Sequence, residues 1–238
     1  MSDNTDNKET EYTTIRFKFS RRGPVRYLGH LDMLRYFQKV MLRAKVNIRY
    51  SEGFNPHQIM SFAYPLGVSM ETLGDYMDID VISYNDLPSL VDDLNNVMHE
   101  GIKIEGAKVI EDKSKNAMAV VYAADYEVLL KDNTLDLNEA VSKLMEKESI
   151  LIRKEKCKKR NKGEFTEKDI KPGIFELSVK NENVLYMNLK SGSELNIKPS
   201  QVIDAINEDS ESNLQIDMIT RVNIYMLNDK EQMVSLID

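Results

Sequence analysis

The stretch IRFKFSRRGPVRYLGHLDMLRYFQKVMLRAK, residues 15–45, decides the fold of the N-terminal half of the chain. Its first five residues, IRFKF, alternate between apolar and basic side chains. This period of two predicts a half-buried strand, with the apolar side chains facing the core and Arg16 and Lys18 on a basic outer face. The dipeptide Gly23-Pro24 ends the strand.

The second part of this stretch, residues 30–45, predicts an amphipathic helix. Arg35, Lys39 and Arg43 follow one another at positions i, i+4 and i+8, on the side opposite the apolar stripe. We therefore expect one buried face and one cationic ridge. The expected buried face consists of Met33, Leu34, Phe37, Val40, Met41 and Ala44.

The remaining periodicity predicts an α+β fold. After the first helix we expect extended segments at 47–50, 59–62 and 73–83, a helix at 85–100 and a strand at 101–110. The order β-α-β-β-α-β is that of the ferredoxin-like motif. In the second half we expect strands at 120–130, 150–153, 174–180, 184–189 and 214–227 and helices at 137–147 and 199–206.

These elements predict two tandem ferredoxin-like units, each an antiparallel sheet covered by helices. The first unit spans 13–112 and the second spans 117–238, after a disordered tail at 1–12. The polar, acidic tail lacks the basic and apolar segments of a signal peptide, and no apolar run approaches the ~18 to 20 residues of a membrane span. We therefore expect a cytoplasmic protein without a membrane partner.

Cysteine content and motifs exclude several kinds of site. Cys157 is the only cysteine among 238 residues, so the chain cannot build a four-cysteine zinc site or ligate an iron–sulfur cluster by itself. It contains no GxxxxGK[ST], GxGxxG or GxSxG motif, so nucleotide hydrolysis, dinucleotide binding and serine-hydrolase chemistry have no support. We expect neither a metal nor a cofactor in this chain.

Charge is distributed unevenly along the chain. The whole chain has a net charge of −7, but residues 15–50 carry +9 and residues 153–162, RKEKCKKRNK, carry +6. Cationic segments in an anionic body attract polyanions, because the local potential steers a ligand. This distribution favours an RNA-binding surface. The cations expected to contact phosphates are Arg16, Lys18, Arg22, Arg35, Lys39 and Arg43, with Lys156, Lys158, Lys159 and Arg160 as a second clamp.

Two short motifs lie within the first basic segment. His30 begins the predicted helix, where its ring and the free N–H groups of the first turn would meet an anionic group, although Gly29 and His30 would also serve simply to begin the helix. The loop SEGFNPH, residues 51–57, combines a flexible glycine, an aromatic ring and an Asn-Pro turn. Such loops engage RNA bases, and the alternative is a structural turn with its phenylalanine in the core. The loop residues expected to contact RNA are Ser51, Gly53, Phe54, Asn55 and His57.

A catalytic role is the main alternative. His30 or His57 would act as a general acid or base, since an imidazole pKa of ~6.5 suits proton transfer. Asp32 would complete a weak constellation of two histidines and one carboxylate, but the spacing matches no metal motif.

Residues 21–81 resemble the radical-SAM-linked protein family, an uncharacterised bacterial domain that occurs alone or fused to a radical S-adenosylmethionine module. The resemblance is carried by GHLD (29–32), YSEGFNPH (50–57) and PLGV (65–68), and more weakly by DIKPGI (169–174), where Lys171 replaces the family's arginine. It implies a setting near ribosomal proteins and a ribonuclease. S-adenosylmethionine and an iron–sulfur cluster would then belong to a partner enzyme.

Together these observations predict a non-catalytic adaptor that binds structured RNA, such as transfer or ribosomal RNA, and works with a radical SAM enzyme or in RNA processing. Two alternatives stay open from the sequence. One is an enzyme that acts on RNA or a small anion through His30 or His57, and the other is a docking subunit whose cationic ridge binds an acidic face of the radical enzyme.

Overall fold

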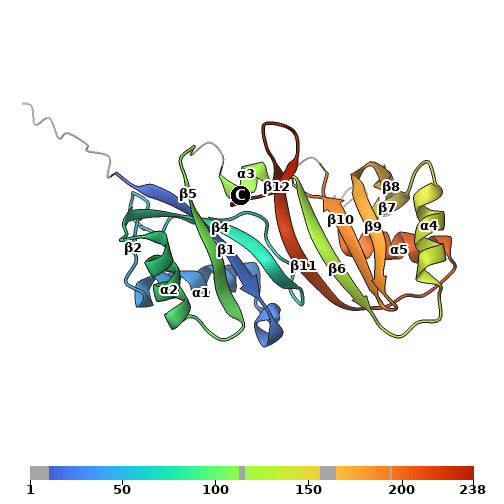
Figure 1. Cartoon of the computed structure of the whole chain (residues 1–238), viewed down its shortest axis with the longest axis horizontal. Helices are drawn as coiled ribbons and strands as arrows, with labels where there is room; N and C mark the ends of the chain where they lie inside the picture. The colour runs from blue at the N-terminus through green and yellow to red at the C-terminus, as the bar shows by residue number, and fades with distance from the viewer. Residues whose placement is uncertain (1–10, 113–115, 156–164, 193–194) are drawn as a thin grey trace, which may run out of the picture.

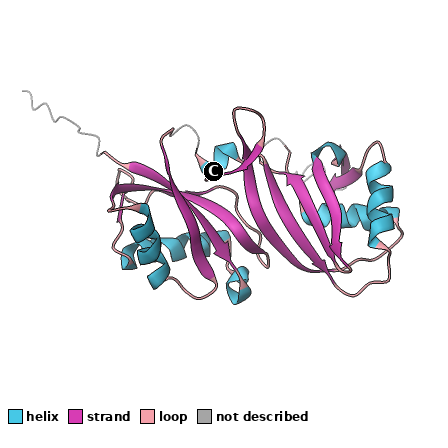
Figure 2. Cartoon of the chain, in the orientation of Figure 1, coloured by secondary structure: helices cyan, strands magenta, loops and turns pink. Residues whose placement is uncertain are grey.

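The computed structural model describes residues 11–112, 116–155, 165–192 and 195–238. Within these residues, ten strands form one mostly antiparallel sheet and two more form a separate hairpin (Figures 1 and 2). A few helices pack beside the sheet, so the fold is α+β, as predicted. No helix of the described residues is both long and apolar enough to cross a membrane.

The N-terminal half follows the predicted order of elements. Strand β1 (Thr13–Arg21) lies between β5 (Ile102–Ile110) and β4 (Glu71–Ser83), and both pairings are antiparallel. The short strands β2 (Asn47–Ile48) and β3 (Met60–Phe62) pair with the other edge of β4. The helices of this half are η1 (Gly23–Tyr27), α1 (His30–Arg43) and α2 (Leu87–Val97).

The amphipathic pattern of α1 determines how this half packs. Met33, Phe37, Val40 and Met41 are buried, as their spacing predicts. The Phe37 ring lies edge-on to that of Phe19 on β1, with centroids 5.1 Å apart. Because the buried side chains of α1 meet the apolar face of β1, the basic side chains of α1 remain on its outer side.

The C-terminal half is organised around β6 (Ala123–Leu130), which lies between β11 (Ile216–Leu227) and β10 (Val184–Lys190). Strand β9 (Ile174–Asn181) forms a hairpin with β10, and the helices α4 (Leu137–Glu146) and α5 (Pro199–Asp209) contribute to the core. Elements that the sequence does not predict are α3 (Ala117–Val120), β8 (Phe165–Asp169), which pairs with β7 (Leu151–Glu155), η2 (Lys171–Gly173) and β12 (Met233–Ser235).

The two halves share one sheet. The sequence predicts two separate sheets, whereas β11 pairs in parallel with β4 through Thr220 opposite Glu71 and Arg221 opposite Thr72. On the sheet face opposite α1, α3 and the C-terminal segment cover part of β1 and β4: Ala117 N–H donates to Asp78, and the Leu236 carbonyl accepts from Arg16. Both faces of the sheet are therefore covered near the junction between the halves.

Candidate nucleic-acid interface

The outer face of α1 is cationic, as predicted. Arg35, Lys39 and Arg43 are all exposed. Arg35 lies 3.3 Å from the Asp32 carboxylate in an exposed pair, and Arg43 donates to the carbonyl of Val97 at the end of α2. An exposed ion pair of this kind is weak, so the Arg35 guanidinium can exchange Asp32 for a phosphate at little cost.

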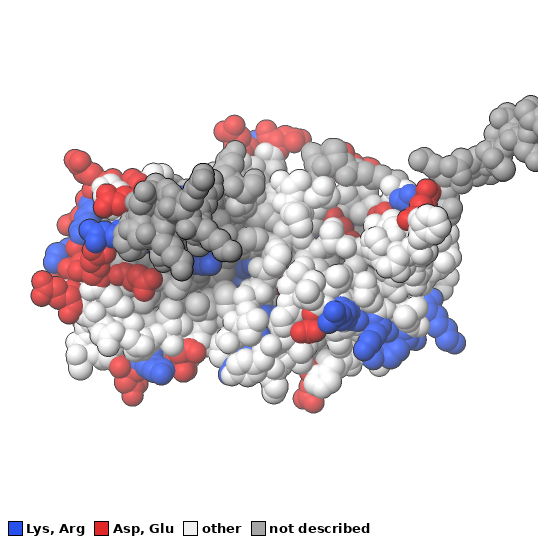
Figure 3. Space-filling view, turned by 180° about the vertical axis from the view of Figure 1, so that it is seen from behind, with Lys and Arg blue, Asp and Glu red and all other residues white. Residues whose placement is uncertain are grey.

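Figure 3 views the molecule from behind Figure 1. Blue side chains gather at its lower right, over the half of the molecule that contains α1, whereas red side chains predominate at the opposite end. The exposed cations of residues 15–50, among them Arg35, Lys39 and Arg43 of α1, contribute to this asymmetry. An approaching polyanion is therefore directed to one end of the molecule.

The loop formed by residues 51–57 presents its phenylalanine to solvent. Phe54 has a relative exposure of 111%, the value of a side chain with no packing partner. Gly53 next to it has φ +106°, a conformation that other residues rarely adopt. The structure therefore excludes Phe54 as part of the core.

Hydrogen bonds hold the base of this loop. The Ser51 hydroxyl lies 2.8 Å from His57 Nδ1 and also accepts from the His57 backbone N–H. Gln58, which is buried, donates to the Gln38 carbonyl in the middle of α1 and to the Tyr50 hydroxyl. The loop is thus anchored beside α1, next to Lys39, and of the predicted loop residues Gly53, Phe54, Asn55 and His57 are exposed and Ser51 is half-buried.

The two histidines that the sequence singles out have different surroundings. The His30 ring lies edge-on to Phe62 with centroids 5.3 Å apart, at the start of α1. His57 instead bonds to Ser51 within its own loop, and Asp32 bonds to Arg35 and to neither histidine. No cluster of three or more His, Cys, Asp or Glu suited to a metal occurs among the described residues. His30, His57 and Asp32 are therefore not joined to one another by any hydrogen bond among the described residues.

The structure contradicts the prediction that Arg16 contacts phosphates. This residue is 1% exposed, and its Nε and Nη2 donate to the two oxygens of Asp78 at 2.7 and 2.9 Å. The alternation of IRFKF correctly places Arg16 opposite the core face of β1. That opposite face is itself covered, which the local pattern does not reveal.

The other predicted cations fall into two further groups. Lys18 is half-buried over the ring of Tyr76, on the sheet face opposite α1, and Arg22 lies 4.0 Å from Glu71 with its side chain largely exposed. Both line a cavity of about 790 Å³ that also includes Glu105 and Asp238. The acidic neighbours reduce the attraction of this cavity for RNA. Lys156, Lys158, Lys159 and Arg160 of the second basic segment lie outside the described residues.

A buried group of charged side chains lies at the junction of the halves, and the sequence pattern does not predict it. Arg221 on β11 forms a bidentate ion pair with Asp75 on β4. Burial lowers the pKa of Arg221, but the attraction of Asp75 more than offsets this and leaves that pKa raised. Arg21, also buried, has its pKa lowered, chiefly because burial removes its charge from water. In the sequence, the only indication of this group was the strand expected at 73–83, in which aspartates occur among apolar residues.

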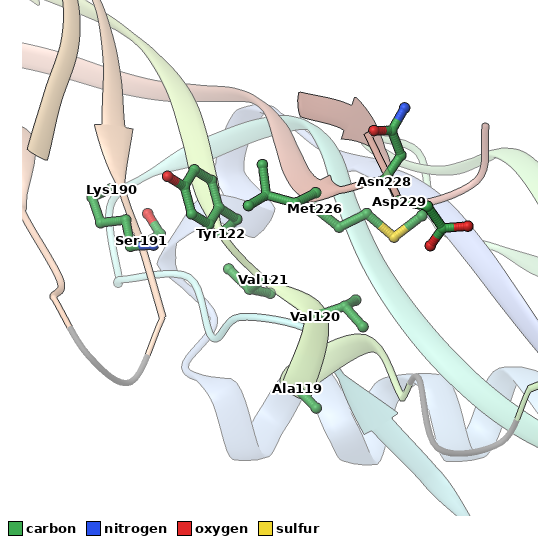
Figure 4. Close-up of a pocket in the computed structure, with 10 residues that line it drawn as sticks. Ala119, Val120, Val121, Tyr122, Lys190, Ser191, Met226, Asn228 and Asp229 are labelled. Carbon is green, nitrogen blue, oxygen red and sulfur yellow. The ribbon is translucent and has the colours of Figure 1, made fainter. Parts of the chain in front are cut away.

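A separate open cavity of about 480 Å³ lies near the start of β6 (Figure 4). The Lys190 ammonium lies 3.4 Å from the centroid of the Tyr122 ring, which also stacks on Phe175. Ser191, Asn228 and Asp229 complete its polar lining. This cavity shares no residue with α1 or with the loop of residues 51–57.

Comparisons with known proteins give a family. A solved structure, the crystal structure of a Cbf5-Nop10-Gar1 complex, contains a chain with a TM-score of 0.48 and 7% identity, over 87% of this chain and 49% of that chain. The present chain spans about half the length of that one, and a similarity of this size carries no functional argument. Among curated proteins, none matches the sequence. The model of one family matches residues 14–199, and the chain therefore belongs to the family described as uncharacterized protein conserved in bacteria (DUF2344).

Proposed function

We propose that this protein is a non-catalytic RNA-binding adaptor of the bacterial cytoplasm. The observation that carries the proposal is the fully exposed ring of Phe54 beside a cationic helix. Exposing a phenylalanine to water is unfavourable by roughly 1.5 to 3 kcal/mol relative to burying it. A ring that covers nothing in the protein is therefore available to stack on an RNA base.

The surroundings of the ring support RNA over other ligands. Lys39 and Arg35 are exposed on α1, and the loop is tied to α1 through Gln58 and the Gln38 carbonyl. A base stacked on Phe54 would place its flanking phosphates near these cations. Single-stranded RNA is bound in this way, by aromatic platforms next to cationic grooves.

Strand order supports a finer description of the fold that hosts this surface. In the first half the order is β5-β1-β4, with β2 and β3 beyond, and in the second it is β11-β6-β10-β9. We interpret each half as one ferredoxin-like unit, in which the first strand lies between the third and fourth of the motif. The hairpin of β7 and β8 would then be an insertion in the second unit.

A second candidate function has an observation in its favour. Leu31 and Leu42 are 64% and 61% exposed, and their spacing of eleven residues puts them on the same side of α1. Two exposed leucines on a cationic helix suit a protein partner with an acidic rim. On the sequence resemblance we infer that this partner is a radical SAM enzyme, which would bring its own S-adenosylmethionine and iron–sulfur cluster.

The test of RNA binding is fluorescence anisotropy of labelled transfer RNA, a ribosomal RNA fragment and matched DNA over a salt series. If three to four phosphates are neutralised, the log–log salt slope should be about −2 to −3 for single-stranded contacts. The charge reversal Arg35→Glu/Lys39→Glu should weaken binding and flatten this slope. The matched control is Lys131→Glu/Lys230→Glu, which makes the same change of net charge at two exposed lysines of the other half.

The control variant separates a local site from a general charge effect. Equal losses in both double variants would refute the α1 surface as the RNA site. Absence of RNA binding by the unmodified chain at low salt would refute the adaptor function. Nuclease-resistant co-purification with a radical enzyme, lost in Leu31→Ser/Leu42→Ser, would then establish the docking function.

A further inference from the structure

Arg21 lies inside the protein without a carboxylate of its own. Its residue is 2% exposed, and its Nη atoms donate to the carbonyls of Leu28, Gly67 and Met70 at 3.0 to 3.1 Å. Its Nε, also buried, has no hydrogen-bond partner among the residues that the structure describes. A buried donor without an acceptor destabilises a protein, above all when it belongs to a cation. The Arg21 Nε–H is therefore suited to bind an acceptor from a ligand.

A small cavity lies against this side chain. It has a volume of about 20 Å³ and is lined by Arg21, His30 and Asp75 together with the apolar side chains of Phe19, Met33 and Phe62, among others. A cavity needs roughly 10 to 15 Å³ to hold one water molecule, so a single oxygen atom fits. His30 itself is exposed, and no hydrogen bond to its ring occurs within the described residues. The cavity therefore joins a buried cation to an accessible ring.

The first turn of α1 adds donors at the same place. Gly29 is the N-cap residue and no side chain of the described residues caps this 14-residue helix, so its first N–H groups have no partner in the described part of the chain. The first backbone bond of the helix runs from Met33 N–H to the Gly29 carbonyl. Leu28, whose carbonyl accepts from Arg21, directly precedes this turn.

The charges around the cavity are positive on balance. Asp75 lies on its wall, but both of its oxygens accept from Arg221, and one also accepts from Thr72. Arg21 is thus an additional cation beside an ion pair that is already neutral. Burial lowers the pKa of Arg21, the attraction of Asp75 offsets part of this, and Arg221 lowers the pKa further. The other nearby carboxylate, Asp32, is exposed and lies with Arg35.

We propose that the start of α1 binds a phosphate group, one oxygen of which enters the cavity and accepts a hydrogen bond from Arg21 Nε. The His30 ring and the free N–H groups of the first helical turn hold the outer oxygens. The phosphate belongs either to the RNA backbone or to a small phosphorylated molecule. Binding of an RNA phosphate rests on the proposed function, whereas binding of a small phosphorylated molecule does not.

The test follows the side-chain Nε–H signals of arginine by two-dimensional ¹H–¹⁵N NMR on the full chain while inorganic phosphate is added at constant ionic strength. The Arg21 signal should shift saturably. The signals of Arg16 and Arg221, whose Nε atoms bond to Asp78 and Asp75, serve as internal controls and should stay in place. Arg21→Lys, which keeps the charge but removes Nε, assigns the signal.

Variants at exposed positions keep the test independent of folding. His30→Ala should weaken phosphate binding by about tenfold, the loss of one good hydrogen bond, whereas the matched change at the exposed His99, His99→Ala, should leave it unaltered. A second titration uses an RNA oligonucleotide: if RNA produces the same shift and displaces phosphate, the source is the RNA backbone. A phosphate shift that RNA leaves unchanged identifies a small phosphorylated ligand.

The result that overturns the site is an Arg21 signal that moves with neither phosphate nor RNA, since the cavity would then hold only water. Equal effects of His30→Ala and His99→Ala would also overturn it. If the chain does not bind RNA in the anisotropy experiment but phosphate still shifts the Arg21 signal, the adaptor function is refuted and the phosphate site is not.

Discussion

Arg221 of β11 and Asp75 of β4 form a buried bidentate ion pair, although 146 residues separate them in the chain. Both N–O distances are 2.7 Å, and the two residues are 1% and 4% exposed. The ion pair joins the two halves at the place where β4 and β11 pair through only two pairs of residues. A side-chain contact thus reinforces a short stretch of backbone pairing.

Asp75→Asn should destabilise the protein by about 3 to 5 kcal/mol, because it leaves the Arg221 guanidinium buried without a counter-charge. Urea unfolding followed by circular dichroism measures this loss. Asp32→Asn, which breaks the exposed pair with Arg35, is the control and should change stability by less than ~1 kcal/mol. Similar losses in the two variants would contradict this account of the junction.

Arg16→Met should reduce stability and leave the RNA site intact. The change leaves the buried Asp78 carboxylate with the Ala117 N–H as its remaining hydrogen-bond partner among the described residues, and a broken buried pair costs about 3 to 5 kcal/mol. Under conditions where the variant is folded, its RNA affinity and salt slope should match those of the unmodified chain. If Arg16→Met lowers the salt slope without a loss of stability, Arg16 belongs to the RNA-binding surface after all.

Phe54→Ala should have the opposite effects. Because the ring contacts nothing in the protein, the free energy of unfolding should change by less than ~0.5 kcal/mol. RNA affinity should fall about 5- to 150-fold, the range for losing one aromatic stacking contact. Phe54→Tyr keeps the ring and should restore binding, so an equally weak Phe54→Tyr variant would argue against stacking.

Tyr76 makes stability sensitive to alkaline pH. Burial raises the pKa of its hydroxyl to about 12, and this hydroxyl donates to Asn223 at 2.6 Å. The folded state therefore favours the neutral form, so the associated stability is complete below the unfolded pKa of ~10 and is lost as the pH rises toward 12. Urea unfolding between pH 9 and about 11.5 should show this decline. Tyr76→Phe should make the free energy of unfolding fall less steeply with pH. If the decline is as steep in this variant, other groups cause it.

Much of the N-terminal half follows from local patterns. The alternation of IRFKF predicts β1, and the helical spacing of Met33, Phe37, Val40 and Met41 predicts the buried face of α1. The hydrophobic period of a strand or helix depends only on residues that are close together in the sequence. It therefore predicts the same element whichever tertiary contacts form the core. The cationic outer face of α1 was predictable for the same reason.

Other features required contacts between distant segments. Alternation shows that Arg16 and Phe17 point in opposite directions, but only α3 and the C-terminal segment decide that the Arg16 side is covered. Phe54 illustrates the converse, because an aromatic residue in a Gly-containing loop is compatible with either a core or a surface position. The structure places it on the surface.

Local sequence patterns were enough to predict the α+β class, the approximate positions of α1 and of the main strands, and the uneven distribution of charge along the chain. Only the tertiary structure decided which charged side chains are paired inside, how β4 joins β11, and that Arg21 lies beside His30 at a small cavity. The physical reason is that periodicity assigns a side chain to a face of its element, whereas burial depends on what packs against that face. The Leu236 carbonyl that covers Arg16 and the Arg221 side chain that pairs with Asp75 are 220 and 146 positions away in the chain.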